Sequence, residues 1–352
     1  MKIALIEIGQ SHDECIYSQI ACIASNSNAK VYLICSESLR ERVSSYDLVE
    51  KIWFFPKFTK PTIFHYFKIW KLILSEKFDK VIFNTAQGKH PKNLLLFPYP
   101  KRIEFLGTLH NLEKLTKNSL GQRIISRKIK KYYLLNDYLL TQIEPEFKEK
   151  MHFGVFYPIF FPTQNSLSRI KPIDEIWICI PGQVELKRRD YEGLFQALET
   201  CKIDSKLKFI LLGSCEHSHG DGGIIKKKIK ELSLQDNFEL YDGFVPMEEF
   251  YTIIKQSNYI MPLIHTNHVS AKLYKNQISG AFNQAFGYKI PFLLESCYKD
   301  SNDFKSNSLF YTLESLPQIL NNIRQVTSSE MYSDEKWTFE YQSKKYWELI
   351  NL

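Results

Sequence analysis

The segment KLYKNQISGAFNQAFGYKIP, from Lys272 to Pro291, decides how we expect this chain to fold. A short apolar run that ends in a proline, Tyr259 to Pro262, precedes it, and a second apolar run, FLLE, follows it. Within the segment, apolar side chains recur at helical spacing. They are Ile278, Ala281, Phe282, Ala285 and Phe286. A strand, a helix and a second strand in this order are typical of a parallel βαβ unit.

The start of the predicted helix has the chemistry for holding a phosphate or diphosphate. Ser279 and Gly280 leave backbone N–H groups free at the helix N-terminus and let another molecule approach closely. The helix dipole favours negative charge at the same place. Lys272 and Lys275 lie just upstream and add positive charge. We therefore expect an anionic ligand to bind here.

The same alternation of strands and helices extends along the whole chain. Strand-like runs in the first half include IALIEI, VYLIC, KIWFF, KVIFN and RIEFLGTL, followed by a basic helix predicted around residues 123–134. Runs in the second half include EIWICIPG, KFILLGS, NFELYDGFV and PFLLE. This pattern predicts an α/β protein with two Rossmann-like domains that face one another across a ligand-binding cleft.

The domain boundary is expected in residues 157–174, because this stretch holds three prolines and several polar residues. The predicted domains are residues 1–162 and 172–330. The amphipathic C-terminal helix, residues 333–352, is expected to pack back on the first domain.

Composition indicates a cytoplasmic protein. No run approaches about 18 apolar residues, and the seven cysteines are scattered with no Cys-x-x-Cys pair. The net charge of +7 is uneven, because seven Lys or Arg and no acidic residue lie between Lys114 and Lys131. That segment is either a solvated helix face or a surface for anionic lipid headgroups or a phosphate-bearing acceptor. No nucleic-acid-binding motif is present.

An aromatic stripe upstream of this basic segment leaves two interpretations open. Phe67, Trp70, Leu74 and Phe78 share one face of a predicted helix that also carries several lysines. This face either packs in the core or contacts the inner face of a membrane, which would make the protein peripheral there.

The second half of the chain resembles the nucleotide-sugar domain of GT-B glycosyltransferases, most closely the retaining family 4 group. Four segments keep the order and spacing of that group, namely IPGQVELKRRDYEGLFQALE, FILLGS, NFELYDGFVPMEEFYTIIKQSNYIMPL and ISGAFNQAFGYKIPFL. In the first half, only the α/β pattern and the segment LGTLHNL are similar. The resemblance implies an enzyme that uses a nucleotide-diphosphate sugar as donor and has no other cofactor.

The resemblance also implies a donor-binding set. A glycine and three cations after the first strand of the second domain would face the donor diphosphate, which arginine neutralises bidentately. The turn DGFVP, which ends the third strand-like run of the second half, would receive the base through its backbone. The set comprises Gly182, Lys187, Arg188, Arg189, Gly213, Gly243, Phe244, Val245, Lys275, Asn276, Ser279, Gly280 and Gln284. Plain strand-to-helix turns and a basic helix entrance explain several of the same residues.

The chain departs from the family at its central motif. Members commonly carry two glutamates eight positions apart, and here Asn276 and Gln284 occupy those places. An amide accepts a hydrogen bond from a hydroxyl but carries no charge. Ribose recognition by Gln284 therefore remains an expectation, whereas charge stabilisation by Asn276 would be weaker. Gln183 also replaces an arginine that often follows the glycine.

In the first domain, His110 is the predicted catalytic residue, because the resemblance places a histidine after this strand in contact with the donor sugar. A structural histidine that caps the loop with Asn111 is the alternative. Gly9 ends the first strand, where an acceptor-side loop needs close backbone approach. No Asp-x-Asp triplet occurs in the sequence, which favours a reaction that needs no metal ion.

These observations predict a glycosyltransferase that moves a sugar from a nucleotide-diphosphate donor to a lipid-linked or saccharide acceptor in surface-glycan assembly. A nucleotide-sugar epimerase on the same scaffold is an alternative, although the sequence reveals no well-placed pair of carboxylates for it. A non-enzymatic partner subunit or sugar-binding module is the other alternative, because the two glutamates are missing.

Overall fold

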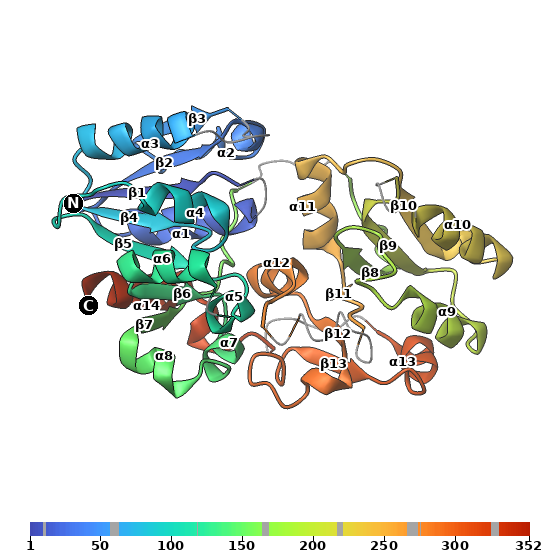
Figure 1. Cartoon of the computed structure of the whole chain (residues 1–352). Coiled ribbons are helices and arrows are strands. Elements are labelled where there is room, and N and C mark those ends of the chain that lie inside the picture. Colours follow the sequence, from blue (N-terminus) through green and yellow to red (C-terminus); the bar gives the residue numbers. More distant parts are fainter. Residues whose placement is uncertain are drawn as a thin grey trace. The chain divides into compact units, whose positions relative to one another are not determined.

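A computed structural model describes residues 1–9, 12–56, 63–117, 119–163, 169–216, 221–265, 274, 276–324 and 331–352 (Figure 1). The chain divides into two compact units. Unit 1 comprises Met1–Pro162, Lys275–Ile278 and Glu335–Leu352, and unit 2 comprises Thr163–Tyr274 and Ser279–Asp334. Each unit is an α/β domain with its own parallel sheet, which confirms the predicted fold class.

Unit 1 contains, among the described residues, a parallel sheet with the strand order β3-β2-β1-β4-β5-β6-β7. The strands are β1 (Lys2–Glu7), β2 (Lys30–Ser36), β3 (Lys51–Phe55), β4 (Lys80–Phe83), β5 (Glu104–Thr108), β6 (Lys131–Leu134) and β7 (His152–Val155). The central strands are continuous Ile, Val and Leu runs, and Ile3–Ile6 are almost fully buried. Such runs are typical of parallel strands that are covered on both faces.

The helices of unit 1 lie in the connections between these strands, except α14, which follows unit 2 in the chain. They are α1 (Ile16–Ala24), α2 (Arg40–Val43), α3 (Ile63–Ser75), α4 (Lys89–Leu95), α5 (Glu113–Thr116), α6 (Leu120–Lys128), α7 (Asp137–Thr141), α8 (Pro145–Lys150) and α14 (Phe339–Asn351), with short 3-10 turns at Asp13–Cys15 and Glu37–Leu39 and before α14 at Glu335–Trp337. α3, α4 and α6 lie next to one another, and α1 lies next to α14.

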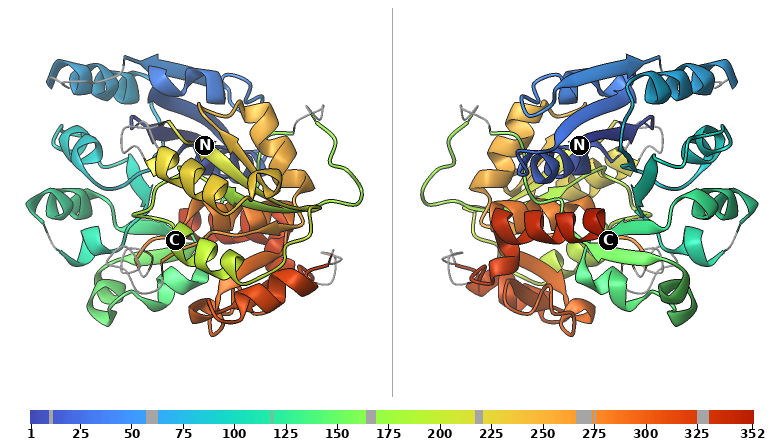
Figure 2. Two further views of the ribbon diagram at one scale, coloured as in Figure 1. Left: turned by 90° about the vertical axis from the view of Figure 1, so that its right-hand side faces the viewer. Right: turned by 90° about the vertical axis from the view of Figure 1, so that its left-hand side faces the viewer.

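The C-terminal helix α14 is part of the core of unit 1 (Figure 2). It packs beside α1 and β7. The ring of Tyr346 stacks on that of Tyr133 with 4.2 Å between centroids, and Trp347 Nε1 donates to the carbonyl of Cys22 at 2.7 Å. A Cβ at Gly154 of β7 would lie 3.1 Å from Leu349 Cβ, so the strand and the helix approach closely.

The predicted basic helix over residues 123–134 is wrong in its second half. α6 ends at Lys128, and Lys131–Leu134 form β6 between β5 and β7. Tyr132 and Tyr133 become fully buried in this strand. Aromatic residues fit a pleated, buried surface well, and here the sheet overrides the helical continuation of the basic pattern.

The aromatic stripe of α3 packs largely against the core. Phe67, Trp70 and Leu74 are partly buried, and Phe78 is fully buried just beyond the helix. Trp70 stacks on Phe97 with centroids 5.5 Å apart. The exposed apolar residues of this helix lie at its start, where Ile63 is 77% and Phe64 is 58% exposed.

Unit 2 contains a second parallel sheet, with the order β10-β9-β8-β11-β12-β13 among the described strands. The strands are β8 (Ile176–Pro181), β9 (Leu207–Ser214), β10 (Phe238–Tyr241), β11 (Tyr259–Ile260), β12 (Phe292–Glu295) and β13 (Ser308–Tyr311). The helices are α9 (Tyr191–Glu199), α10 (Asp221–Glu231), α11 (Met247–Gln256), α12 (Gly280–Tyr288) and α13 (Leu316–Asn322), with 3-10 turns at Gln235–Asn237 and Ser296–Tyr298. No helix in the described ranges is both long enough and apolar enough to cross a membrane.

Each sheet has one point at which the chain reverses its direction of strand addition. The reversal lies between β1 and β4 in unit 1 and between β8 and β11 in unit 2. At such a point the loops beyond the carboxyl ends of the two strands run in opposite directions and leave a crevice. The fold therefore predicts ligand sites at the loops that follow these four strands.

Candidate functional sites

In unit 2, two glycines bring the start of the loop after β8 into direct contact with the end of β9. The amide of Gly182 donates to the carbonyl of Leu212 at 3.0 Å, and a Cβ on Gly213 would overlap the carbonyl of Gly182. Gly182 also has φ of +98°, a conformation that glycine adopts without strain. Both predicted donor-side glycines are thus required for the backbone to close around the end of β8.

Arg189 joins the two strands of the reversal point. It is 8% exposed, and its guanidinium donates to the carbonyls of Pro181 and Pro262 and, through Nε at 3.3 Å, to that of Gln183. Pro181 ends β8 and Pro262 follows β11. Since the sequence predicts Arg189 as a direct diphosphate ligand, its engagement with three carbonyls instead favours a role in shaping this loop.

The other two predicted cations of the loop are exposed. Lys187 points to solvent, and the side chain of Arg188 is 61% exposed while its Nε lies 2.7 Å from Glu185 Oε2. These two side chains are available at the surface of the loop, whereas Arg189 is not.

The predicted base-binding turn follows β10. Gly243 has open space where a side chain would lie, Phe244 is 70% exposed, and Val245 is buried. An open glycine beside an exposed aromatic ring permits a planar ligand to approach the backbone.

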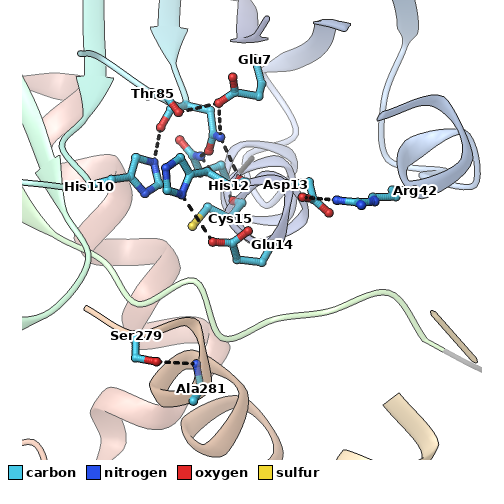
Figure 3. Close-up of polar contacts among 12 residues, drawn as sticks. Glu7, His12, Asp13, Glu14, Cys15, Arg42, Thr85, His110, Ser279 and Ala281 are labelled. Atoms are coloured by element: carbon cyan, nitrogen blue, oxygen red, sulfur yellow. Dashed lines mark hydrogen bonds and ion pairs between the residues drawn. The ribbon is translucent and has the colours of Figure 1, made fainter. Parts of the chain in front are cut away.

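The N-terminus of α12 forms as the sequence predicts. Ser279 is the N-cap residue, and its Oγ accepts a hydrogen bond from Ala281 N at 3.4 Å (Figure 3). Gly280 is exposed, and nothing lies within 4 Å of a Cβ built there. Because α12 connects β11 to β12, this end of the helix belongs to the carboxyl edge of the sheet, next to the reversal point.

The remaining residues of this motif occupy different surroundings. Lys275 lies outside the described residues. Asn276 belongs to unit 1, where its carbonyl accepts a hydrogen bond from Leu112 N at 2.8 Å. Gln284, on α12, has a buried Oε1 that accepts no hydrogen bond within the described residues. A buried acceptor without a donor is unfavourable, so a ligand hydroxyl or a water would stabilise it.

Sequence reasoning missed a buried carboxyl at the same edge of unit 2. Glu295 ends β12, is 5% exposed, and accepts a hydrogen bond from Tyr311 OH at 2.8 Å through Oε1. Oε2 has no partner among the described residues. Burial raises the pKa of this carboxyl to about 7. A glutamate directly after the apolar run FLL was the available signal.

His265, which follows β11, lies near this carboxyl edge. Its Nε2 lies 2.5 Å from the carbonyl of Leu186, and its Nδ1 lies 3.6 Å from Asp190 Oδ1. The two ring nitrogens thus face a backbone carbonyl on one side and the carboxylate that caps α9 on the other.

In unit 1, a cavity of about 260 Å³ lies at the reversal point between β1 and β4. Its walls come from the ends of these strands, the turn before α4 and one residue of α5. The lining residues are Ile6, Glu7, Ile8, Gly9, His12, Phe83, Thr85, Gln87, Gly88, Lys89, His90, Pro91 and Lys114. Gly9, the predicted acceptor-side residue, is among them, and His110 is not.

A buried polar network supports the floor of this cavity. Asn84, fully buried after β4, donates through Nδ2 to Glu7 Oε2 at 2.7 Å and to the carbonyl of His12 at 2.9 Å. Thr85 Oγ1 donates to the same Glu7 oxygen at 2.6 Å, and Gly9 N donates to Glu7 Oε1 at 2.6 Å. Burial raises the pKa of Glu7 despite these hydrogen bonds. The network fixes the carboxyl group at the cavity wall.

Two stacked imidazoles lie beside this floor (Figure 3). The rings of His12 and His110 are 3.8 Å apart between centroids and 20° from parallel. His110 is buried, and Nε2 donates to the carbonyl of Asn84 at 2.7 Å. Burial and the neighbouring His12 lower the pKa of His110 to about 3, so this ring is neutral.

His12 has the opposite electrostatic character. Burial alone would lower its pKa, but the carboxylates of Glu14, Glu7 and Asp13 outweigh this effect and raise it. Its Nδ1 lies 3.6 Å from Glu14 Oε1. The residue has φ of +67°, an uncommon conformation for a residue other than glycine, and the Asn84 hydrogen bond to its carbonyl helps to hold it. His12 therefore forms the cavity wall, and His110 supports its ring from behind.

The sequence thus located the loops that carry the polar groups of each unit more reliably than the individual side chains. The sequence did not predict Glu7, His12 and Glu14 as site residues, because they lie in or after the first strand and match no motif. The glutamate inside IALIEI and the histidine that follows it were the signals present.

No protein-family profile and no curated protein matches the sequence. Solved structures do match. HepE from Anabaena, in complex with UDP and glucose, is 12% identical, with 100% of this chain and 99% of that chain covered and a TM-score of 0.70. The lipopolysaccharide outer core galactosyltransferase WaaB is 13% identical, with coverages of 100% and 99% and a TM-score of 0.59.

A third solved structure is the UDP-GlcNAc 2-epimerase from Neisseria meningitidis bound to UDP-GlcNAc. It is 12% identical, with 100% of both chains covered and a TM-score of 0.61. These likenesses extend over the sheets of both units. The chain therefore has the GT-B fold, which glycosyltransferases and UDP-GlcNAc 2-epimerases share.

Proposed function

We propose that this protein is a glycosyltransferase that uses a nucleotide-diphosphate sugar as donor. The observation that carries the proposal is the reversal point of unit 2, where the glycine loop after β8 and the open N-terminus of α12 follow neighbouring strands. Backbone amides and a helix dipole at such a point favour a diphosphate. UDP is the nucleotide to test first, because HepE was solved in complex with it.

In this proposal the residues of unit 2 have distinct roles. The amides at Ser279 and Gly280 would hold the diphosphate, and the exposed Lys187 and Arg188 would neutralise charge as it develops on the leaving group. Arg189 would hold the loop in shape. The base would lie against the backbone of residues 243–245. Gln284 Oε1, which accepts no hydrogen bond from the described residues, would accept one from a ribose hydroxyl. Retention of configuration, as in family 4, and independence of metal remain predictions.

The acceptor side of the proposal assigns a lipid-linked or saccharide acceptor to unit 1, in surface-glycan assembly at the cytoplasmic face of a membrane. Exposed apolar side chains at α3, at the end of the adjacent α4 and at α6, which also adjoins α4, support peripheral contact together with the basic segment 114–131. The side chains are Ile63, Phe64, Leu96 and Leu120. Co-sedimentation with anionic vesicles should fall in Ile63→Glu/Phe64→Glu. Unchanged co-sedimentation would argue against the membrane contact.

The donor site is tested by a pair of glycine substitutions. Gly280→Val places a branched side chain where the diphosphate would lie, and Gly223→Val on α10 is the matched control, because neither glycine has an atom within 4 Å of a new Cβ. Binding of UDP and release of UDP from UDP-sugars should fall about 100-fold in Gly280→Val and stay unchanged in Gly223→Val. Equal activity in both variants would contradict the proposed donor site.

A nucleotide-sugar epimerase is a second candidate, and one observation favours it. Glu295 is a buried carboxyl at the carboxyl edge of unit 2 with a pKa near neutrality, a property of groups that transfer protons. Incubation with UDP-GlcNAc and no acceptor separates the two functions. Formation of a 2-epimer that Glu295→Gln abolishes would favour the epimerase, and an unchanged sugar would favour the transferase.

A further inference from the structure

The cavity of unit 1 combines two kinds of polar wall that the donor site does not use. One wall is the floor of the cavity, where Thr85 donates a hydrogen bond to Glu7. The other wall carries nitrogen groups from three segments that are distant in sequence, and these groups belong to His12, Lys89, His90 and Lys114. The cavity lies at the reversal point of the sheet, the place in such a fold where ligands bind.

The cationic wall is formed by the first residues of α4, by α5 and by the loop after β1. Gly88 has φ of +84°, a conformation open to glycine that lets the chain turn sharply before Lys89. Lys89 and Lys114 are both exposed, so their ammonium groups can reach an anion at the cavity mouth. His12 adds an imidazole at the same wall, and its carboxylate neighbours raise its pKa, which favours the protonated ring.

The floor suits hydroxyl groups. Glu7 Oε1 accepts one hydrogen bond, from Gly9 N, among the described residues, and a carboxylate oxygen has two acceptor positions. Thr85 Oγ1 donates to Glu7 and keeps its own acceptor capacity. The apolar lining residues Ile6, Phe83 and Pro91 offer a surface to the carbon face of a sugar ring.

We propose that this cavity binds a sugar that carries a phosphate ester, with its hydroxyls on Glu7 and Thr85 and its phosphate between Lys89, Lys114 and His12. The volume of about 260 Å³ is below the roughly 300–1,000 Å³ of pockets for drug-sized ligands, so it accommodates one sugar ring with its phosphate. If the proposed function holds, this ligand is the acceptor, and the enzyme selects acceptors by that phosphate.

Calorimetric titration of the full chain, saturated with UDP to occupy a donor site, tests this. The probe is glucose 1-phosphate, and glucose and inorganic phosphate are its two parts. We expect glucose 1-phosphate to bind at least about tenfold more tightly than either part, because both walls are then engaged. Equal affinity for inorganic phosphate alone, or no binding at millimolar concentration, would overturn the proposal.

Matched variants locate the binding. Lys89→Ala/Lys114→Ala should weaken glucose 1-phosphate about tenfold or more and leave the weak binding of glucose unchanged. Lys101→Ala/Lys128→Ala removes two exposed lysines of the same unit that do not line the cavity, and it should bind as the unaltered chain does. Equal losses in the two double variants would mean that general positive charge, and not this cavity, attracts the phosphate.

The proton resonances of the His12 ring give a readout that does not depend on transfer. They should shift during the glucose 1-phosphate titration, and binding without such a shift would place the ligand elsewhere. A farnesyl-diphosphate-linked glucose separates the two sources of this chemistry. Tighter binding of it than of glucose 1-phosphate indicates a lipid-linked acceptor, and equal binding indicates a soluble sugar phosphate.

The two proposals fail separately. A chain that binds UDP but not glucose 1-phosphate would keep its donor site and lose the cavity assignment. A chain that binds glucose 1-phosphate through Lys89 and Lys114 but binds no nucleotide would keep the cavity assignment and lose the transferase.

Discussion

Ionisation of Glu295 should make the stability of unit 2 depend on pH, and replacement of Glu295 by glutamine should remove this dependence. The carboxyl is 5% exposed, and burial raises its pKa from 4.5 to about 7. The folded protein therefore binds this proton more tightly than the unfolded chain does. The resulting stabilisation is complete below pH 4.5 and is lost as the pH rises towards 7.

The size of the effect follows from the shift. One pKa unit corresponds to about 1.4 kcal/mol, so the full effect is about 3 kcal/mol, of which about 2.5 kcal/mol falls between pH 5 and pH 8. Glutamine has nearly the same shape, still accepts from Tyr311 and carries no charge. Relative to the unaltered chain, Glu295→Gln should gain about 2.5 kcal/mol of unfolding free energy between pH 5 and pH 8.

Urea unfolding at the two pH values measures this difference, with hydrogen exchange on peptides from β12 to report on unit 2 alone. Glu192→Gln, at an exposed position of α9 in the same unit, controls for the loss of a carboxylate. If Glu295→Gln and the unaltered chain differ by the same amount at pH 5 and at pH 8, the carboxyl does not titrate as its burial requires, and the reasoning fails.

Two further predictions concern the reversal points. Gly213→Ala should destabilise unit 2 by about 2–4 kcal/mol, because the new Cβ overlaps the Gly182 carbonyl, whereas Gly243→Ala, in open space, should cost little; equal midpoints in urea would contradict the close approach. Glu14→Gln should lower the pKa of His12, since it removes the carboxylate that lies 3.6 Å from Nδ1; an unchanged NMR titration of the His12 ring would refute the pairing.

The alternation of strands and helices in the sequence was sufficient to predict the fold class, because continuous Ile, Val and Leu runs have few other uses than strands covered on both faces. Where the helical pattern of a segment conflicted with its pairing in a sheet, the segment formed a strand. Lys131–Leu134 continue a basic helical pattern, yet Tyr132 and Tyr133 are buried in β6. The aromatic pair Tyr132 and Tyr133 was the local signal for a strand, and the basic pattern around it obscured that signal.

The site shows the same division. Ser279 and Gly280 were recognised because a helix N-terminus has a local signature, and Ser279 is indeed the N-cap residue of α12. Arg189 illustrates the limit of prediction from local sequence. Its three carbonyl partners come from segments up to about 80 positions apart, so the sequence next to Arg189 does not predict them. The stacking of His12 on His110 joins two segments that are distant in sequence, so the sequence next to either residue does not predict it.

The position of α14 has a consequence for synthesis on the ribosome. Its side chains complete the core of unit 1, yet residues 339–351 are translated after all of unit 2. Unit 2 lacks such a dependence, so it can fold while translation of the chain continues. The surface of α1, β6 and β7 that α14 covers stays uncovered until α14 emerges, and during that interval the nascent chain is most exposed to aggregation and to chaperones.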